Sequence, residues 1–416
     1  MTAPDHLTVL YYRFIVTDGT DTDYYEDDDL YDGGLGQPYD DSPDRSWQID
    51  VYAPDFTVPD WFKDAVVYQI FPDRFRNGVE ANDPISGTFF YDEDPGVVTA
   101  PQWNWPVPDP RVAGPWEGSY SKLFYGGDLQ GIIDKLDYLH DLGVNTLYLN
   151  PIFESPSNHK YDTTDYSVID DNFGDLATFI TLTQELQDRG MYLILDGVFN
   201  HTSSDSMYFD RYGRYETAGA CEAVTSTYRS WYYFSPASPP GTGVCAGDTN
   251  YEAWWGFDSL PKLNTTNVPA VRSFIYSDTN AIARYWLEQG ADGWRLDVAG
   301  DVHPSFWRDW RDDIRDAKET AITIAEEWGD ASHFILGDQL DSTMNYRFRN
   351  AVIGVLRETD WQDTNSTIRA LSLSEFDSVM HGIEEDYPPE AFYAMMNLVG
   401  GHDVNRVLIP LDQDGD

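Results

Sequence analysis

From Trp61 onward, short apolar runs alternate with longer amphipathic stretches. The pattern is clearest between Leu129 and Leu139, where apolar residues recur at the i, i+3, i+4, i+7 spacing of one helix face. The expected strands cover 66–71, 146–150, 192–196, 293–297 and 321–326, and the expected helices cover 128–142, 175–188, 270–288 and 305–318. Repeated βα units predict a parallel sheet, and their number favours a (β/α)8 TIM barrel over an open doubly wound sheet.

Two additions to this α/β barrel are expected. Residues 1–57 form a short N-terminal β segment, in which β-like runs at 7–16 and 47–52 flank an acidic linker at 17–44. Residues 58–416 form the catalytic barrel. Within it, residues 202–269 follow strand 3 and are too long for an ordinary βα loop, so we expect an inserted subdomain over the active face.

The end of the barrel is incomplete in the sequence. Met344 and residues 394–399 mark two more strand positions, with a helix expected over 366–382, and only 13 residues follow Asp403. They cannot supply the eighth strand and the last helices. We therefore expect a fragment, one product of a split gene, or a chain that a partner completes, because an unclosed barrel leaves open sheet edges.

Acidic residues dominate the charge, with 72 Asp and Glu against 26 Lys and Arg and a formal net charge of -46. Nucleic acid and anionic membranes would repel such a surface, so neutral or cationic ligands are expected. The sequence shows no run long enough to span a bilayer and no signal-peptide pattern at its start, which predicts a cytoplasmic protein, with an extracellular location as the alternative. The oligomeric state stays open.

The same charge predicts adaptation to high salt. The acids are dispersed through patterned segments, so they repel one another across the folded surface. Because molar salt shortens the Debye length to about 3 Å, the midpoint of thermal unfolding is expected to rise along a series of increasing KCl. A midpoint that falls steadily over this series would contradict the prediction.

Polar residues gather where the predicted strands end, the part of a barrel that carries chemistry. They are Asp196, Asn200 and His201; Arg295 and Asp297; Glu326 and Glu327; His402 and Asp403. In the stretch GADGWRLDVAGD, period-2 alternation puts Arg295 and Asp297 on one side of a strand, where the guanidinium would hold the carboxylate ionised. A structural ion pair without a catalytic role is the alternative.

Two carboxyl groups about 5 Å apart across a sugar ring are what retaining glycoside hydrolysis requires. Asp297 and Glu326, on neighbouring predicted strands, suit the nucleophile and the acid/base. Asp403 would bind ring hydroxyls of the sugar, and His201 and His402 would form hydrogen bonds with other hydroxyls. Aromatic residues between 231 and 257 would either stack on sugar faces or form the core of the inserted subdomain.

Residues 61–406 resemble the α-amylase family of retaining glycoside hydrolases. The resemblance rests on DGVFNH at 196–201, GWRLD at 293–297, AEEW at 325–328 and GGHD at 400–403, which follow the order of the family's four signatures. A fifth motif, LPKLN at 260–264, is similar to that of neopullulanases, cyclomaltodextrinases and maltogenic amylases, as are SNHKYDTTDY at 157–166 and VVYQIFPDRFRNG at 66–78.

This resemblance implies hydrolysis of α-1,4-glucosidic bonds in starch-type glucans, maltooligosaccharides or cyclodextrins through a covalent glycosyl-enzyme intermediate. It implies Asp297 as nucleophile, Glu326 as acid/base and Asp403 as transition-state stabiliser. It also implies that Tyr161 stacks on the sugar whose bond is cut, with His159, His201, Arg295 and His402 around it. Transglycosylation or glucoside isomerisation at the same site, and a non-catalytic carbohydrate-binding protein, are the alternatives.

The resemblance further implies a structural calcium ion. Its oxygen ligands would be Asn77, Asn82, Asp83, the Gly126 carbonyl and Asp128. Val79 stands where a further polar ligand is usual, and an Asx-rich turn without metal is the alternative.

Two further features limit what the resemblance implies. Gly300 and Asp301 replace an Asn–Glu pair of many neopullulanase-like members, so action on α-1,6 bonds is not implied. The N-terminal segment is shorter than the β-sandwich through which that subgroup often dimerises, so its dimer is not implied either. Cys221 and Cys245, the two cysteines of the chain, could close a disulfide over the loop between them.

Overall fold

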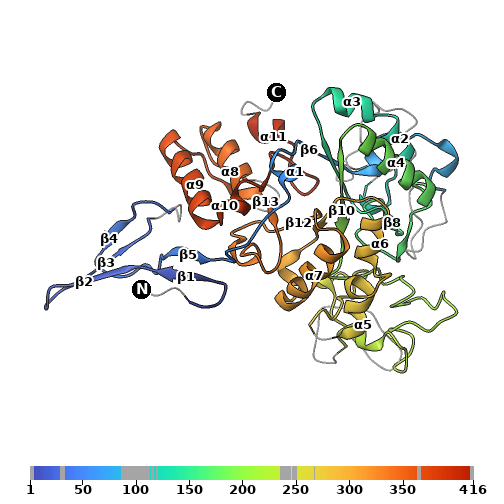
Figure 1. Ribbon diagram of the computed structural model, residues 1–416, viewed down its shortest axis with the longest axis horizontal. Helices are drawn as coiled ribbons and strands as arrows, with labels where there is room; N and C mark the ends of the chain where they lie inside the picture. Colours follow the sequence, from blue (N-terminus) through green and yellow to red (C-terminus); the bar gives the residue numbers. More distant parts are fainter. Residues whose placement is uncertain are drawn as a thin grey trace. The chain divides into compact units, whose positions relative to one another are not determined.

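The computed structural model describes residues 4–28, 33–85, 113, 117–118, 120–234, 245, 251–266, 268–362 and 367–412. The chain divides into two units, Met1–Asp64 with Ile322–Asp416, and Ala65–Ala321. Each unit contains parallel strands joined through helices, drawn in sequence colours in Figure 1. The domain boundaries expected at residue 57 and at 202–269 stay predictions.

A parallel sheet of four strands runs through the Ala65–Ala321 unit. Its order is β6 (Val67–Ile70), β7 (Thr146–Leu149), β10 (Tyr192–Gly197) and β11 (Gly293–Leu296). Every residue of β7 and β11 is buried, as expected for strands that are covered on both faces. The four strands predicted in this part of the sequence are therefore confirmed.

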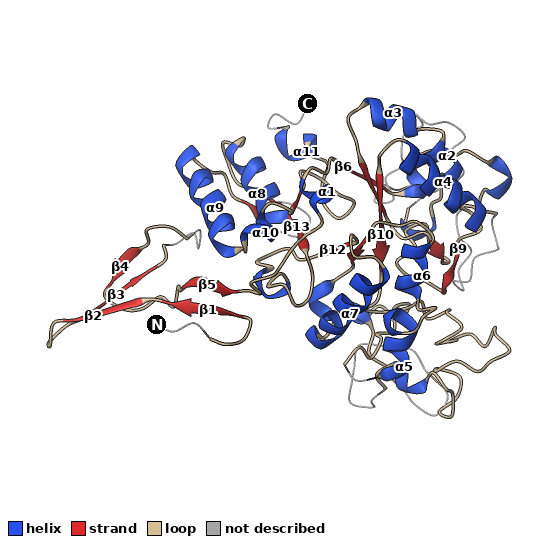
Figure 2. Ribbon diagram, viewed as in Figure 1, coloured by secondary structure: helices blue, strands red, loops and turns tan. Residues whose placement is uncertain are grey.

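Helices separate these strands along the chain. They are α2 (Leu129–Ile133), α3 (Leu136–Asp141), α4 (Leu176–Asp188), α5 (Pro269–Arg272), α6 (Ile282–Glu288) and α7 (Pro304–Ala317). The carboxylates of Asp128 and Asp175 cap α2 and α4 by accepting backbone N–H groups in the first turn. Figure 2 shows the alternation as red strands and blue helices.

Two of the predicted helices are interrupted. The helix expected over 128–142 breaks between α2 and α3, where Lys135 has a ψ of 4°. The helix expected over 270–288 continues from α5 into the π-helical turn η6 (Ser273–Ser277) and resumes only at Ile282. The intervening Asp278 to Asn280 are residues that compete with helical hydrogen bonds, which explains why periodicity alone predicted one long helix.

The same unit contains short irregular elements. A hairpin joins β8 (Phe153–Glu154) to β9 (Asp165–Ile169). The short 3₁₀ helices are η1 (Pro72–Arg74), η2 (Glu80–Asn82), η3 (Tyr120–Lys122), η4 (Arg229–Trp231), η5 (Trp254–Gly256) and η7 (Ala299–Asp301). In the predicted inserted segment, Tyr208 stacks on Trp231, and Cys221 and Cys245 form a disulfide.

The other unit combines the N-terminal strands with the last part of the chain. Its strands are β1 (Thr8–Tyr12), β2 (Phe14–Thr17), β3 (Thr22–Glu26), β4 (Gln37–Tyr39), β5 (Trp47–Val51), β12 (Ile322–Ala325), β13 (Ser342–Asn345), β14 (Trp361–Gln362), β15 (Thr367–Ile368) and β16 (Met396–Asn397). Its helices are α1 (Asp60–Lys63), η8 (Ser332–Phe334), α8 (Tyr346–Val355), α9 (Leu373–Asp386), α10 (Pro389–Phe392) and α11 (Leu408–Leu411). Parallel pairing joins β12 to β13 and β13 to β16.

Three expectations for this unit need correction. The acidic linker at 17–44 contains β3 and β4, because Thr22–Glu26 includes a threonine and two tyrosines, which favour strands; residues 29–32 lie outside the described part. Helix α8 was not predicted. The helix expected from Ser366, a position outside the described residues, begins at Leu373, where Ser372 and Glu375 form a capping box.

The described parts of the two units hold four and three parallel strands in succession with helices between them, which fits a (β/α)8 barrel. None of the helices in the described ranges combines the length and the apolar character needed to cross a bilayer.

Candidate active site

Arg295 joins two carboxylates in the Ala65–Ala321 unit. The side chain is 1% exposed, and its Nη1 donates to Asp297 Oδ1 at 2.9 Å, as the alternation predicted. The same nitrogen donates to Asp196 Oδ1 at 2.9 Å. Strands β10 and β11 set Asp196 in register with Arg295, so the sheet itself builds this arrangement.

Asp196 accepts hydrogen bonds from several side chains of this cluster. Its Oδ2 accepts the hydroxyl groups of Tyr148 at 2.6 Å and Tyr161 at 2.7 Å. Burial raises the pKa of Asp196 above its ordinary value, while Arg295 and the two hydroxyls lower it. Sequence reasoning placed Asp196 at a strand end but gave it no role, because the register of two strands is not readable from either alone.

Asp297 directly follows β11 and is 6% exposed. Its N–H donates to the Gly197 carbonyl at 3.2 Å. The next residue, Val298, has left-handed dihedrals, φ 41° and ψ 52°. A β-branched residue rarely adopts this conformation, and such backbone strain concentrates at functional sites. The chain therefore turns sharply immediately after the carboxylate.

Tyr161 and His159 lie beside this cluster. The Tyr161 hydroxyl accepts the Asn150 amide at 3.0 Å, and the rings of Tyr161 and His159 stack with centroids 6.0 Å apart. The Tyr161 N–H donates to His159 Nδ1 at 3.1 Å. Burial lowers the pKa of His159 to about 4, so this imidazole is neutral at neutral pH.

His201 connects the cluster to a pair of tryptophans. Its Nε2 donates to the Tyr161 carbonyl at 3.1 Å, and its Nδ1 accepts the Asn200 amide at 3.2 Å, an assignment that requires the neutral Nε2–H tautomer. Burial lowers the pKa of His201 to about 3. Both nitrogens thus have protein partners, whereas the ring face stacks on Trp254 with centroids 5.6 Å apart.

The stack extends to the surface as an aromatic platform formed by Trp254 and Trp255. Their ring centroids are 5.4 Å apart, and Trp255 is 82% exposed. Trp254 Nε1 donates to Asp301 Oδ2 at 3.0 Å, which fixes the ring beside His201. By contrast, Trp231 and Tyr232 are buried, so the aromatics of the inserted segment divide between core and surface.

The Ile322–Asp416 part of the other unit carries the remaining predicted residues. Glu326 follows β12, is 8% exposed, and accepts a hydrogen bond from Trp328 Nε1 at 3.2 Å. Glu327 accepts the Gly329 N–H at 3.0 Å. His402 Nε2 lies 3.2 Å from Asp403 Oδ1. The structure thus brings His159, Tyr161, His201, Arg295 and Asp297 together in one unit, and Glu326, His402 and Asp403 belong to the other.

The residues expected to bind calcium form a loop cluster with the oxygen chemistry that this ion prefers. Asn77 Nδ2 donates to Asp83 Oδ1 at 2.6 Å, and a Cβ on Gly126 would lie 2.6 Å from that same oxygen. Asn82 Oδ1 is buried without a hydrogen-bond partner in the described part of the chain. Asp128 accepts the N–H groups of Gly78, Val79 and Gly131. These residues fit a calcium ion, with Asp128 also shaping the loop.

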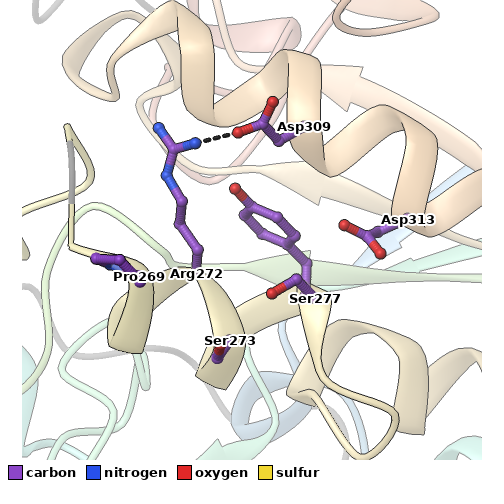
Figure 3. A pocket seen from close by; sticks show the side chains of 7 residues that line it. Pro269, Arg272, Ser273, Ser277, Asp309 and Asp313 are labelled. Atoms are coloured by element: carbon purple, nitrogen blue, oxygen red, sulfur yellow. Dashed lines mark hydrogen bonds and ion pairs between the residues drawn. The ribbon is translucent and has the colours of Figure 1, made fainter.

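A cavity of about 390 Å³ lies elsewhere in the same unit and is lined by none of the predicted site residues. Its walls are Pro269, Arg272, Ser273, Tyr276, Ser277, Asp309 and Asp313. Figure 3 shows Arg272 paired with Asp309 across its rim. Arg272 also donates to the Thr266 carbonyl and to Ser305, each at 2.9 Å, so it braces the π-helical turn against α7.

The chain is similar to one known protein family and to several individual proteins. The family described as "Alpha amylase, catalytic domain" matches residues 69–416. An amylopullulanase of Thermoanaerobacterium saccharolyticum is 44% identical over 425 residues, covering 97% of this chain and 32% of the relative. Neopullulanase 2 of Thermoactinomyces vulgaris is 40% identical over 354 residues, covering 85% of this chain and 52% of the relative.

Among solved structures, the cyclic α-maltosyl-(1→6)-maltose hydrolase of Arthrobacter globiformis is similar at 35% identity, with a TM-score of 0.68. The similarity covers 86% of this chain and 70% of that chain. The chain therefore spans about a third of the amylopullulanase and about half of the neopullulanase named above.

Proposed function

The chain belongs to the α-amylase family of glycoside hydrolases, and on this premise we propose that it cleaves α-1,4-glucosidic bonds of starch-type glucans, maltooligosaccharides or cyclodextrins with retention of configuration. The observation that carries this proposal is Asp297, a nearly buried carboxylate held at 2.9 Å by Arg295. Arg295 is itself fixed by Asp196, so the carboxylate is preorganised for attack.

In the proposed mechanism, Asp297 attacks the anomeric carbon as Glu326 donates its proton to the glycosidic oxygen, and the bond to the leaving sugar breaks. Glu326, now a carboxylate, takes a proton from water. That water attacks the anomeric carbon and releases Asp297. Asp403 binds ring hydroxyls and stabilises the distorted sugar, with His402 beside it. His159 and Tyr161 lie beside the Arg295 cluster, where Tyr161 would stack on the reacting sugar.

The substrate class is tested by incubating the protein with soluble starch, pullulan, α-cyclodextrin and maltoheptaose at high salt and identifying the products. The proposal expects release of maltooligosaccharides from starch and opening of cyclodextrin. Cleavage at α-1,6 bonds of pullulan alone would contradict the α-1,4 assignment. An excess of longer or isomerised products in the presence of glucose would favour transglycosylation or isomerisation, in which a sugar replaces water.

The aromatic platform is proposed to bind further glucose units. Trp254→Ala is expected to raise KM for maltoheptaose by roughly 2- to 12-fold, because an aromatic contact contributes about 0.5–1.5 kcal/mol. The value of kcat should change little. The control is Tyr138→Ala, which removes an aromatic ring that is 53% exposed on α3. Equal KM values in Trp254→Ala and the control would contradict this role.

A structural calcium ion is also proposed, with Asn77, Asn82, Asp83, the Gly126 carbonyl and Asp128 as ligands. When bound, calcium would hold the loop after β6 to the turn before α2. Chelation with EGTA is expected to lower the midpoint of thermal unfolding by about 3 °C, since a ligand at 100 times its Kd stabilises by about 2.7 kcal/mol. Added CaCl₂ should restore it.

The matched variants for this experiment are Asp83→Asn and Glu80→Gln. Asp83→Asn should make the midpoint independent of EGTA, whereas the exposed Glu80 can change without effect. A wild-type midpoint that is the same in CaCl₂ and in EGTA would rule the site out.

A further inference from the structure

Asp162 is a buried carboxylate that the proposed mechanism does not use. It is 0% exposed, and its Oδ1 accepts the hydroxyl groups of Ser155, at 2.6 Å, and Ser157. Its Oδ2 is also buried and has no hydrogen-bond partner in the described ranges. Burying a carboxylate oxygen without a partner destabilises the folded state, unless the oxygen is protonated or contacts a cation.

The basic side chains near Asp162 in the sequence interact with other partners. His159 Nδ1 lies 3.9 Å from Asp162 Oδ1, but it accepts the Tyr161 N–H at 3.1 Å and so has no proton to donate. Lys160 Nζ lies 2.7 Å from Asp170 Oδ2 and donates to the Ser155 carbonyl at 3.2 Å. The negative charge of Asp162 is therefore not balanced by either neighbour.

A second buried oxygen, that of Ser204, lies on the chain segment paired with the one that carries Asp162. Ser204 is 0% exposed, and its Oγ has no hydrogen-bond partner in the part of the chain that the structure describes. The Ser203 N–H donates to the Thr163 carbonyl at 2.8 Å. Asp162 immediately precedes Thr163 in the sequence, and Ser204 immediately follows Ser203. The two chain segments are thus held against each other.

Asp205 completes an oxygen-rich group. It is 1% exposed, and its Oδ2 accepts Arg214 Nη1 at 2.7 Å. Burial, together with the charges of Asp170 and Asp205, raises the pKa of Asp162, which places the carboxylates within electrostatic reach of one another. Two carboxylates and one guanidinium leave a single net negative charge.

We propose that Asp162, Ser204 and Asp205 bind a monovalent cation, Na⁺ or K⁺, through their side-chain oxygens. Carboxylate and hydroxyl oxygens are the ligands that hard cations prefer. One positive charge neutralises the group, whereas a divalent ion would leave an excess. The cation ties the segment that carries His159 and Tyr161 to the start of the inserted segment after His201.

This site is tested by measuring thermal unfolding in NaCl, KCl and choline chloride. A single ionic strength keeps charge screening constant, and EGTA removes any contribution from calcium. The wild-type midpoint is expected to be higher in NaCl or KCl than in choline chloride by about 2 °C or more. Asp162→Asn should abolish the difference and Ser204→Ala should reduce it. Asp171→Asn, an exposed neighbour, should retain it.

Equal wild-type midpoints in the three salts would overturn the proposal, as would a full difference retained in Asp162→Asn. If Asp162→Asn does not fold, Ser204→Ala decides, because an unchanged difference in that variant overturns the site. Crystals soaked in Tl⁺ provide a direct readout. An anomalous peak within coordination distance of Asp162 Oδ2 and Ser204 Oγ supports the proposal, and its absence refutes it.

Discussion

Asp297→Asn is expected to lower kcat on maltoheptaose by on the order of 10⁴-fold or more, because it removes the nucleophile of both chemical steps. Asparagine is nearly isosteric and still offers an oxygen to Arg295, which keeps its bond to Asp196. The fold and KM should therefore change little. Steady-state kinetics and a thermal unfolding curve on the same preparation measure both effects.

The control for this variant is Asp278→Asn, which neutralises an exposed acid between η6 and α6. It should retain full activity. If Asp297→Asn kept more than about a tenth of wild-type kcat, the nucleophile assignment would be wrong, and the Arg295–Asp297 pair would have to be read as structural.

Glu326→Gln is expected to lower kcat on maltoheptaose by about 10²- to 10⁴-fold, the range that general acid–base catalysis contributes. Glutamine can still accept the Trp328 indole hydrogen bond, but it has no proton to give to the leaving oxygen. The first step should be nearly normal for a nitrophenyl maltoside, whose leaving group needs no protonation. Added azide should then speed turnover by attacking the glycosyl-enzyme without a base.

Glu327→Gln is the matched control, because Glu327 directs its carboxylate to the Gly329 N–H of its own turn. It should keep activity within about twofold of wild type, because the proposed mechanism gives this carboxylate no role. Equal losses in the two variants, or a loss in Glu326→Gln that does not depend on the leaving group, would disprove the acid/base assignment.

Local signals in the sequence predicted the strands well. The strands β7, β10 and β11 follow short, mostly apolar runs and lie within one or two residues of their expected bounds. The helices were less predictable, because the interruptions at Lys135 and at Ser273–Ser277 depend on local hydrogen bonds that periodicity does not record. The strands β3 and β4 were missed because the segment around them is acidic and each of them is short.

The candidate site was predictable in its residue types but not in its contacts. Alternation along one strand was enough to pair Arg295 with Asp297. The part played by Asp196 depends on the register between β10 and β11, and the bond from Trp254 to Asp301 joins residues far apart in sequence. Such long-range pairings follow from the folded structure and cannot be read from local patterns. The cytoplasmic location and the salt adaptation stay predictions.

The central claim is that Asp297 forms a covalent glycosyl-enzyme, so that each cleavage inverts the anomeric carbon twice. Proton NMR of the reducing-end signals during the first minutes of maltoheptaose hydrolysis, at high enzyme concentration, tests this claim most directly. The account predicts that the product forms first as the α-anomer and that the β-anomer appears later by mutarotation. First appearance of the β-anomer would contradict it.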